Sequence, residues 1–527
     1  MLEEGIRITN ITDRQQHYYD WQKLIMDKIV PLKPFFSPRG YVASWSTLIG
    51  YEYQWSLTDN LPYMEFTDYH EGQSDTTELI IADSNWVGLN PLLYDNYVDQ
   101  EIISLISEPL LKIAPDSEYL KTGIIYDWEQ NDWSNKYETH FQFFMRDNIY
   151  WNPSYNITGR DNTSLPLELA SLMPGLKSGE TSNGTNHQIT AKDAVFTLLT
   201  HANPITNKNA DYYSWINDIW IDPTNHLSFH IIVDGDLSTV KLDPYAPFLY
   251  DLNLAIIPEF FLNSSMTNST YSSGGKEMKG IYEGIESTSQ WQTYAISAFF
   301  SGKYMLDYSV KNLITVLRAS PYWFGIGAKD GQPQDLDLET IKIRIIPDLT
   351  SALVEFKEGN LDLTCLSLFS EMRKEMEDDP LFTVQNKIVN YMSFLAFNLH
   401  RPFVGGDDNY VYLNETGKEG YTKACAVRKA ICYAINLEEM NNDIYNGEYF
   451  TSLSPIHPIH SFWYYQDIIK YRHNLDSARE WLEAAGYETP VTETSDTTTT
   501  IVSAVFYVIP ISMFYLIKIQ RRRIRKI

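Results

Sequence analysis

Two histidines three residues apart, His457 and His460 in the stretch IHPIHSFWYY, are the residues whose types and spacing most suggest metal chemistry. Imidazole nitrogens are common ligands of zinc, nickel and copper. Two prolines, Pro455 and Pro458, lie close to these histidines, and this context favours a loop in which they bind no metal. The chain contains no GxSxG, no GxxxxGK[ST] and no HExxH, since His70-Glu71 lacks the second histidine. The sequence therefore predicts neither a catalytic centre nor a bound metal or cofactor.

Aromatic residues follow these histidines directly, and Trp463 and Tyr464 are candidates for stacking on a bound ligand. The same side chains would equally suit packing in a core or a hinge, and both interpretations stay open. An enzyme that hydrolyses glycans would also use aromatic side chains. It would need two carboxyl groups facing each other across a cleft.

Composition excludes several classes of protein. The chain has 527 residues, of which 44% are hydrophobic and 14% aromatic, so most of it is expected to fold into two or more domains. Its net charge of -27 would repel phosphate backbones, and nucleic acid is therefore not expected as a partner. Three cysteines, Cys365, Cys425 and Cys432, cannot build a disulfide framework and are expected to be buried free thiols.

The C-terminal end predicts a membrane anchor. Residues 501–517, IVSAVFYVIPISMFYLI, carry no charge, and the basic stretch RRRIRK follows them. By the positive-inside rule the tail at 520–527 would be cytoplasmic and the bulk of the chain extracellular. We therefore expect a threonine-rich stalk at 491–500, a transmembrane helix at 501–519 and a single-pass protein of the cell membrane. No cleavable signal peptide is visible in the first 30 residues.

The elements that would position a binding site alternate between strand and helix. Residues 79–96 begin as a strand and then turn at an Asn-Pro pair, and residues 137–152 alternate like a half-buried strand. Residues 189–204 have one apolar helical face, with Thr190 and Asp193 at capping-box spacing. Such alternation implies an α/β sheet.

Three further segments, at 341–366, 425–447 and 475–487, continue this pattern. Each contains a helix with a polar residue placed to cap its start, and two of the helices end at a glycine. The predicted caps are Asp348, Asn436 and Asp476, and the predicted stops are Gly359 and Gly486.

Together these segments resemble, in their order, extracellular solute-binding proteins of family 5, the peptide and nickel group of ABC importers. Residues 189–198, ITAKDAVFTL, are similar to the family's "ltAeDVvfsl", and 137–152 are similar to "ytFtLRdgvkW". Residues 341–366 resemble the "pd..a...al.sGeiDi" unit, with Asp362 in the final acidic place. Residues 299–325 parallel "GTGPYkl" but lack its first glycine and its proline, which puts the backbone shape of that turn in doubt.

The order of the segments differs from that of the family in one place. Residues 12–55 resemble the closing segment of the family, although they precede its opening strand. Residues 1–76 are therefore expected to be such a closing segment and residues 77–490 the solute-binding domain. Within the first segment we expect one apolar helical stripe made of Trp21, Leu24, Ile25 and Ile29. A permuted chain, two proteins in tandem and an incomplete gene model all stay open.

The resemblance implies an α/β fold with two lobes, of the type II periplasmic-binding-protein kind in its peptide-binding cluster, with a second lobe that is incomplete or permuted. It implies a receptor that binds a peptide or another small solute and delivers it to ABC permease subunits driven by separate ATPases. No chemical step is expected. The resemblance places Asn85 and Trp86 where family members contact the backbone of the ligand. Tyr212 and Tyr213, in the segment after the helix at 189–204, are a second candidate pair, and Asn398 is a further candidate.

A surface structural or adhesive glycoprotein that keeps the fold without ligand binding is the alternative. Seven Asn-x-Ser/Thr sequons fit an exported glycoprotein, although an asparagine-rich chain contains about that many by chance. A saturable ligand would exclude this alternative.

Overall fold

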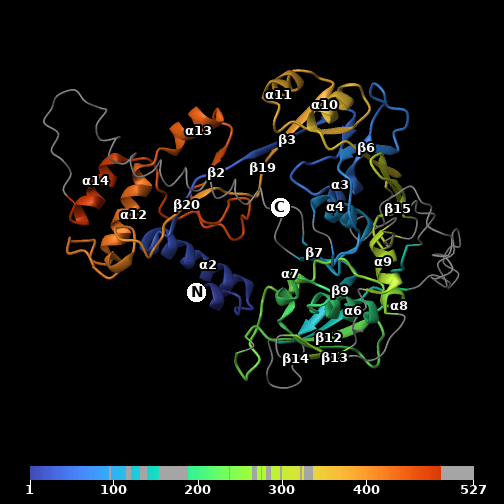
Figure 1. Ribbon diagram of the computed structural model, residues 1–527, viewed down its shortest axis with the longest axis horizontal. Helices are drawn as coiled ribbons and strands as arrows, with labels where there is room; N and C mark the ends of the chain where they lie inside the picture. Colours follow the sequence, from blue (N-terminus) through green and yellow to red (C-terminus); the bar gives the residue numbers. More distant parts are fainter. Residues whose placement is uncertain are drawn as a thin grey trace. The chain divides into compact units, whose positions relative to one another are not determined.

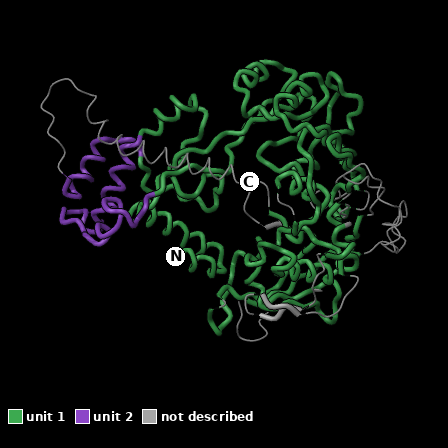
Figure 2. The backbone as a smooth tube through the Cα atoms, in the orientation of Figure 1, with its two compact units in different colours: residues 1–396, 436–471 green, residues 397–435, 472–527 purple. Residues whose placement is uncertain are grey.

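The computed structural model of the protein describes residues 1–93, 96–113, 120–130, 139–152, 188–236, 238–263, 270–273, 276–279, 287–296, 300–320, 323–325 and 336–487. The chain divides into two compact units (Figure 2). Unit 1 comprises residues 1–396 and 436–471, and unit 2 comprises residues 397–435 and 472–527. The predicted stalk, transmembrane helix and basic tail lie outside the described residues.

A four-stranded mixed sheet in unit 1 has the order β15-β16-β17-β6. Its strands are β6 (Glu78–Asp83), β15 (Tyr304–Val310), β16 (Ile314–Ala319) and β17 (Thr340–Ile345). Strands β6 and β17 are parallel, and β15, β16 and β17 are antiparallel neighbours. The predicted opening strand is confirmed as β6, which leaves the sheet at the turn that precedes α4 (Tyr97–Ile106).

A second sheet is fully antiparallel, with the order β11-β12-β10-β9. It contains β9 (Ile125–Gln130), β10 (His140–Met145), β11 (Ile216–Ile221) and β12 (Ser228–Val233). The predicted helix at 189–204 is α6 (Ala191–His201), and the capping box of Thr190 and Asp193 is confirmed. Its buried face joins the largest core cluster, which also includes Phe143 and Phe229 of the sheet.

In the third sheet, a strand from early in the chain lies between two strands formed by much later residues. Strand β3 (Arg39–Trp45) lies between β18 (Leu363–Cys365) and β19 (Phe382–Ile388) and is antiparallel to both. Figure 1 shows the blue β3 beside the orange β19. The segment that resembles a closing segment is therefore an integral part of unit 1.

Shorter elements complete unit 1. Its two-stranded sheets are β1 (Leu32–Pro34) with β20 (Phe394–Ala396), β2 (Phe36–Ser37) with β21 (Phe450–Thr451), β4 (Leu48–Ile49) with β5 (Glu65–Phe66), β7 (Leu111–Ile113) with β8 (Leu120–Thr122), and β13 (Thr270–Ser273) with β14 (Lys276–Lys279). Its other helices are α1 (Leu2–Gly5), α2 (Ile11–Leu24), the π-helix η1 (Ile25–Ile29), α3 (Leu57–Asn60), η2 (Leu61–Tyr63), η3 (Ala210–Tyr213), α7 (Phe248–Asp251), α8 (Glu259–Leu262), α9 (Ser289–Ile296), α10 (Leu349–Lys357), α11 (Ser370–Glu377) and α13 (Leu437–Tyr445).

Unit 2 is built on two packed helices, α12 (Lys423–Ala434) and α14 (Leu475–Ala484), with the short helix η5 (Gly406–Asn409). Lys429 of α12 is buried between the rings of Tyr421 and Trp481, at 4.2 and 4.6 Å from their centroids. This arrangement gives the buried ammonium group favourable cation–π contacts.

Most predicted caps are confirmed. Asp348 caps α10, Asn436 caps α13, and Gly359 and Gly486 adopt positive φ directly after their helices. One cap was wrong, because the side chain of Asn474 rather than that of Asp476 accepts from the first amides of α14. All three cysteines are free thiols.

The apolar stripe predicted for the first long helix was also wrong. The buried side chains of α2 and η1 are Arg14, Gln22 and Met26, whereas Leu24 is exposed. Gln22 donates through Nε2 to the Trp463 carbonyl at 2.8 Å, and its Oε1 accepts from the Tyr465 amide at 3.1 Å. Polar contacts with residues 462–465 therefore determine which face is buried.

The predicted transmembrane helix, and the single-pass localisation that depended on it, are contradicted. No helix in the described part of the chain is long and apolar enough to cross a bilayer. The longest described α-helix, α2, has 14 residues and carries Asp13, Arg14, Asp20 and Lys23. A helix of that length spans about 21 Å, short of the ~30 Å hydrocarbon core.

Candidate functional site

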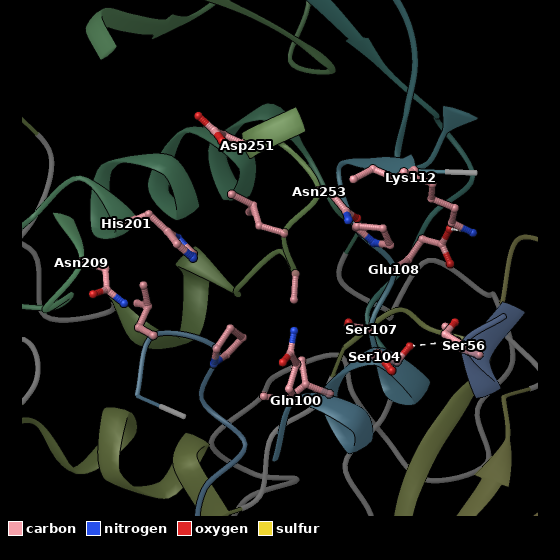
Figure 3. A pocket seen from close by; sticks show the side chains of 18 of the residues that line it. Ser56, Gln100, Ser104, Ser107, Glu108, Lys112, His201, Asn209, Asp251 and Asn253 are labelled. Atoms are coloured by element: carbon pink, nitrogen blue, oxygen red, sulfur yellow. Dashed lines mark hydrogen bonds and ion pairs between the residues drawn. The ribbon is translucent and has the colours of Figure 1, made fainter. Parts of the chain in front are cut away.

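A cavity of about 650 Å³ in unit 1 is the candidate site (Figure 3). Helix α4 and the loop that follows it form one wall, and the end of α6 with η3 forms another. The segment 251–255 and Lys303 close it. Backbone bonds hold these walls together, since the amides of Leu110 and Leu111 donate to the carbonyls of Leu254 and Leu252 at 3.2 and 3.1 Å.

One wall of the cavity is polar and combines uncharged groups with Lys208. In Figure 3 the side chains of His201 and Gln100 point into the same space. Burial lowers the pKa of His201 to about 4, so its imidazole is uncharged at neutral pH. Burial also raises the pKa of Asp251 to about 7, so this carboxyl is about half ionised there. His201 and Gln100 therefore offer hydrogen bonds without charge.

The opposite wall contains an ion pair. Glu108 is buried and pairs with Lys112, which lies four residues further along the chain in β7. The indole Nε1 of Trp323 lies 3.4 Å from the second carboxylate oxygen of Glu108. The single negative charge of Glu108 is therefore already bound by protein groups.

Lys303 lies beside this ion pair at the start of β15 and is 8% exposed. Its Nζ donates to the carbonyl of Thr58 at 2.8 Å. Burial and, to a smaller extent, the neighbouring Lys112 lower the pKa of Lys303 to about 8, while Glu108 and Asp59 act in the opposite direction.

The turn that presents Lys303 is fixed, although it lacks the glycine and proline of the family pattern. The amide of Gly302 donates to the Ile106 carbonyl at 2.8 Å, and the amide of Ser320 donates to the Lys303 carbonyl at 2.7 Å. A Cβ on Gly302 would lie 2.3 Å from the Ile106 carbonyl carbon. Glycine at 302 therefore allows the turn to approach α4 closely enough to place Lys303 in the cavity wall.

We expect Lys303→Met to raise the free energy of unfolding by about 1–2 kcal/mol near pH 7, because it removes a buried ammonium group with one acceptor. The folded pKa of about 8 lies below the unfolded value, so the ionised lysine costs stability below pH 8. That cost disappears as pH rises to about 10.5, and the gain of the variant should disappear with it. Urea unfolding at pH 7 and pH 10 measures this, with the exposed Lys311→Met as control. A Lys303→Met protein less stable at pH 7 would contradict the prediction.

Tyr212 and Tyr213 are the predicted ligand residues that line this cavity. Tyr212 is 74% exposed, and the ring of Tyr213 lies edge-on to His201 with centroids 5.1 Å apart. Both belong to the short helix η3. An exposed aromatic ring beside a cavity is available for stacking on a ligand.

The other predicted residues lie elsewhere. The Asn85 amide exchanges two hydrogen bonds with Asn312, at 2.7 and 2.9 Å, and Trp86 is buried with its indole 3.1 Å from Ser309 and from Thr315. Both residues hold the β15–β16 hairpin against the segment after β6.

Trp463 and Tyr464 pack in the neighbourhood of α2. The guanidinium of Arg14 lies 5.5 Å from the Trp463 ring centroid, and the ring of Tyr18 lies 5.6 Å from it. The Tyr464 amide donates to the His460 carbonyl at 2.9 Å. Asn398 belongs to unit 2, where its side-chain oxygen accepts from the His400 amide at 3.1 Å.

The histidines considered as metal ligands make other contacts. His457 Nδ1 accepts from the Ile459 amide at 3.2 Å, and His460 Nε2 lies 3.1 Å from Asn390 Oδ1. In the part of the chain that the structure describes, no group of three or more His, Cys, Asp or Glu side chains could hold a metal ion.

A polar cavity of about 650 Å³ lies within the size range of sites that bind small ligands. The model of the bacterial extracellular solute-binding proteins, family 5, matches residues 182–508. The chain belongs to this family, and the predicted resemblance is confirmed.

Individual proteins agree with this assignment. The structure of HbpA2 from Haemophilus parasuis matches with a TM-score of 0.50 at 14% identity, covering 78% of this chain and 67% of that one. NikZ from Campylobacter jejuni, solved in complex with Ni(L-His), matches with a TM-score of 0.45 at 17% identity over 81% and 66% of the two chains. The match to HbpA2 supports the α/β fold of the two-lobed solute-binding proteins, which was predicted from the sequence.

Among curated proteins, the heme-binding protein A of Haemophilus influenzae is 24% identical over 184 residues. The matched region covers 34% of this chain and 28% of that protein. The chain thus corresponds to part of the length of its relatives.

Proposed function

We propose that this chain is the solute receptor of an ABC import system, that it binds a peptide or a similar small solute in the cavity of unit 1, and that it delivers this solute to membrane permease subunits driven by separate ATPases. The receptor carries out no chemical step. The observation that supports the proposal best is the polar cavity of about 650 Å³ in a member of the family 5 solute-binding proteins.

The chemistry of the cavity fits a peptide-sized solute. Amide, hydroxyl and neutral imidazole groups can bond a peptide backbone without regard to its side chains, and the tyrosines of η3 can pack on apolar groups. Three of the similar proteins were solved with Ni(L-His), with the peptide STSA and with a nonapeptide. A peptide or a small chelate is therefore the first class of solute to test.

Thermal unfolding of the protein with a panel of di-, tri- and pentapeptides tests the proposal. A solute present at 100 times its Kd should add about 2.7 kcal/mol to the free energy of unfolding and raise Tm. Mass spectrometry of material released from the purified protein by mild denaturation would identify a solute that is already bound. If no peptide or released compound raises Tm in a saturable way, the proposal is wrong.

Tyr212→Ala is expected to weaken solute binding about tenfold and to leave Tm of the free protein unchanged, since the ring is 74% exposed and lines the cavity. Calorimetric titration measures the affinity. Tyr69→Ala, at an exposed tyrosine away from the cavity lining, is the matched control. Equal affinities of the two variants would place the solute elsewhere.

A further inference from the structure

The ammonium group of Lys303 has unused hydrogen-bonding capacity. A lysine ammonium has three N–H donors, and within the described residues the one hydrogen bond of Lys303 goes to the Thr58 carbonyl at 2.8 Å. The side chain is more than nine-tenths buried, yet it lines the cavity. Its remaining N–H donors are therefore available to a ligand in the cavity.

No carboxylate accepts a hydrogen bond from Lys303 among the described residues. The buried carboxylate of Glu108 has Lys112 as its ion-pair partner, and the indole of Trp323 lies against its other oxygen. The carboxylate of Asp59 attracts Lys303 electrostatically, but it accepts its hydrogen bond from the hydroxyl of Ser56 at 2.6 Å. Lys303 is therefore near two carboxylates and hydrogen-bonded to neither.

A buried ammonium group whose donors are not all bonded is costly, and an anionic ligand can supply the missing acceptors. The side chains of Gln100, Ser104 and Asn253 in the lining are neutral and can surround such a ligand without repelling it. Lys303 also stands where the family pattern has proline, so this cation belongs to this chain and not to the shared pattern.

We infer that Lys303 anchors a carboxylate group of the solute, with Lys112 beside it and Thr58 fixing its orientation. The inference rests on the proposed function and narrows its solute to acids, such as a peptide with a free C-terminus. The solute would lie with its carboxylate at the Lys303 corner and its less polar part toward Tyr212 and Tyr213.

Calorimetric titration with matched acids and amides tests this. The probes are trialanine and pentaalanine, each with a free C-terminus and as the C-terminal amide, together with succinate and inorganic phosphate. The unsubstituted protein is expected to bind the acid form of a peptide at least tenfold more tightly than its amide. In Lys303→Met the two forms should bind within twofold of each other, with the affinity for the amide unchanged. Lys311→Met, which removes an exposed lysine outside the cavity lining, should keep the tenfold preference.

The outcomes separate the two proposals. Equal binding of acid and amide by the unsubstituted protein would overturn the carboxylate anchor and leave the solute receptor standing. A preference for the acid that persists in Lys303→Met would also overturn it. Binding of phosphate that depends on Lys303, without such binding of any carboxylate, would overturn the assignment to carboxylates. Absence of binding by every probe would count against the anchor and against a peptide-binding receptor together.

Discussion

Asp362→Ala is expected to lower the free energy of unfolding by about 3–5 kcal/mol, the cost of removing one partner from a buried charged pair. The carboxylate of Asp362 lies 2.7 Å from His70 Nε2 and accepts from the Ile80 amide through its other oxygen. Trp45 stacks on the ring of His70, with centroids 4.5 Å apart and planes 3° from parallel. Alanine would leave two buried donors without an acceptor.

The hydrogen bonds of the two His70 ring nitrogens suggest a second variant, for which a smaller loss of stability is expected. His70 Nδ1 lies 2.8 Å from the Glu71 carbonyl, so Nδ1 must donate, and Nε2 shares a proton with Asp362. Asp362→Asn can donate to a neutral His70 and still accept from Ile80, so a loss of about 1 kcal/mol is expected. Urea unfolding of both variants, with Asp378→Ala as an exposed control, measures the difference. A loss below about 1 kcal/mol in Asp362→Ala would contradict this account.

Gly359→Ala should lower the free energy of unfolding by at least about 3 kcal/mol. Gly359 follows α10 with φ of +78°, a conformation that costs an alanine about 1–2 kcal/mol. An added Cβ would also lie 1.8 Å from the carbonyl oxygen of Glu71, in a loop more than 280 residues earlier in the chain. Gly72 in that loop faces Gly359 in return, and its own Cβ would lie 2.8 Å from the Gly359 oxygen. The two loops would have to separate.

Gly447→Ala is the matched control for this prediction. Gly447 also has a positive φ, of +73°, but its added Cβ meets only the end of the Asn442 side chain at 3.3 Å. It should show the conformational cost alone, about 1 kcal/mol. If the two alanine variants unfold at the same denaturant concentration, the contact between the loops contributes nothing.

The sequence predicted local features of the fold well. Caps such as Thr190 with Asp193 depend on residues three apart, and the structure contains them. The error at α14 has the same local origin, because Asn474 and Asp476 can both cap and the sequence alone does not rank them. The buried face of α2 could not be read from periodicity, since Gln22 is buried by bonds to a loop more than 430 residues away.

The candidate site was harder to predict. Tyr212 and Tyr213 were candidates because they follow the helix at 189–204, and they line the cavity. Lys303, Glu108 and His201 are scattered along the chain, and their states depend on burial that no short window shows. The one available signal was the lysine in place of the family's proline.

The position of β3 affects how the chain can fold during its synthesis. This strand, residues 39–45, is hydrogen-bonded on both sides to partners at 363–365 and 382–388. At 5–20 residues per second, a ribosome needs roughly 15–70 s to supply those partners after β3 has emerged. Throughout that interval β3 has two open edges and the buried side chains of Ala43 and Trp45 exposed. Production of the protein should therefore depend on a chaperone that covers the nascent N-terminal segment until residue 388 has been synthesised.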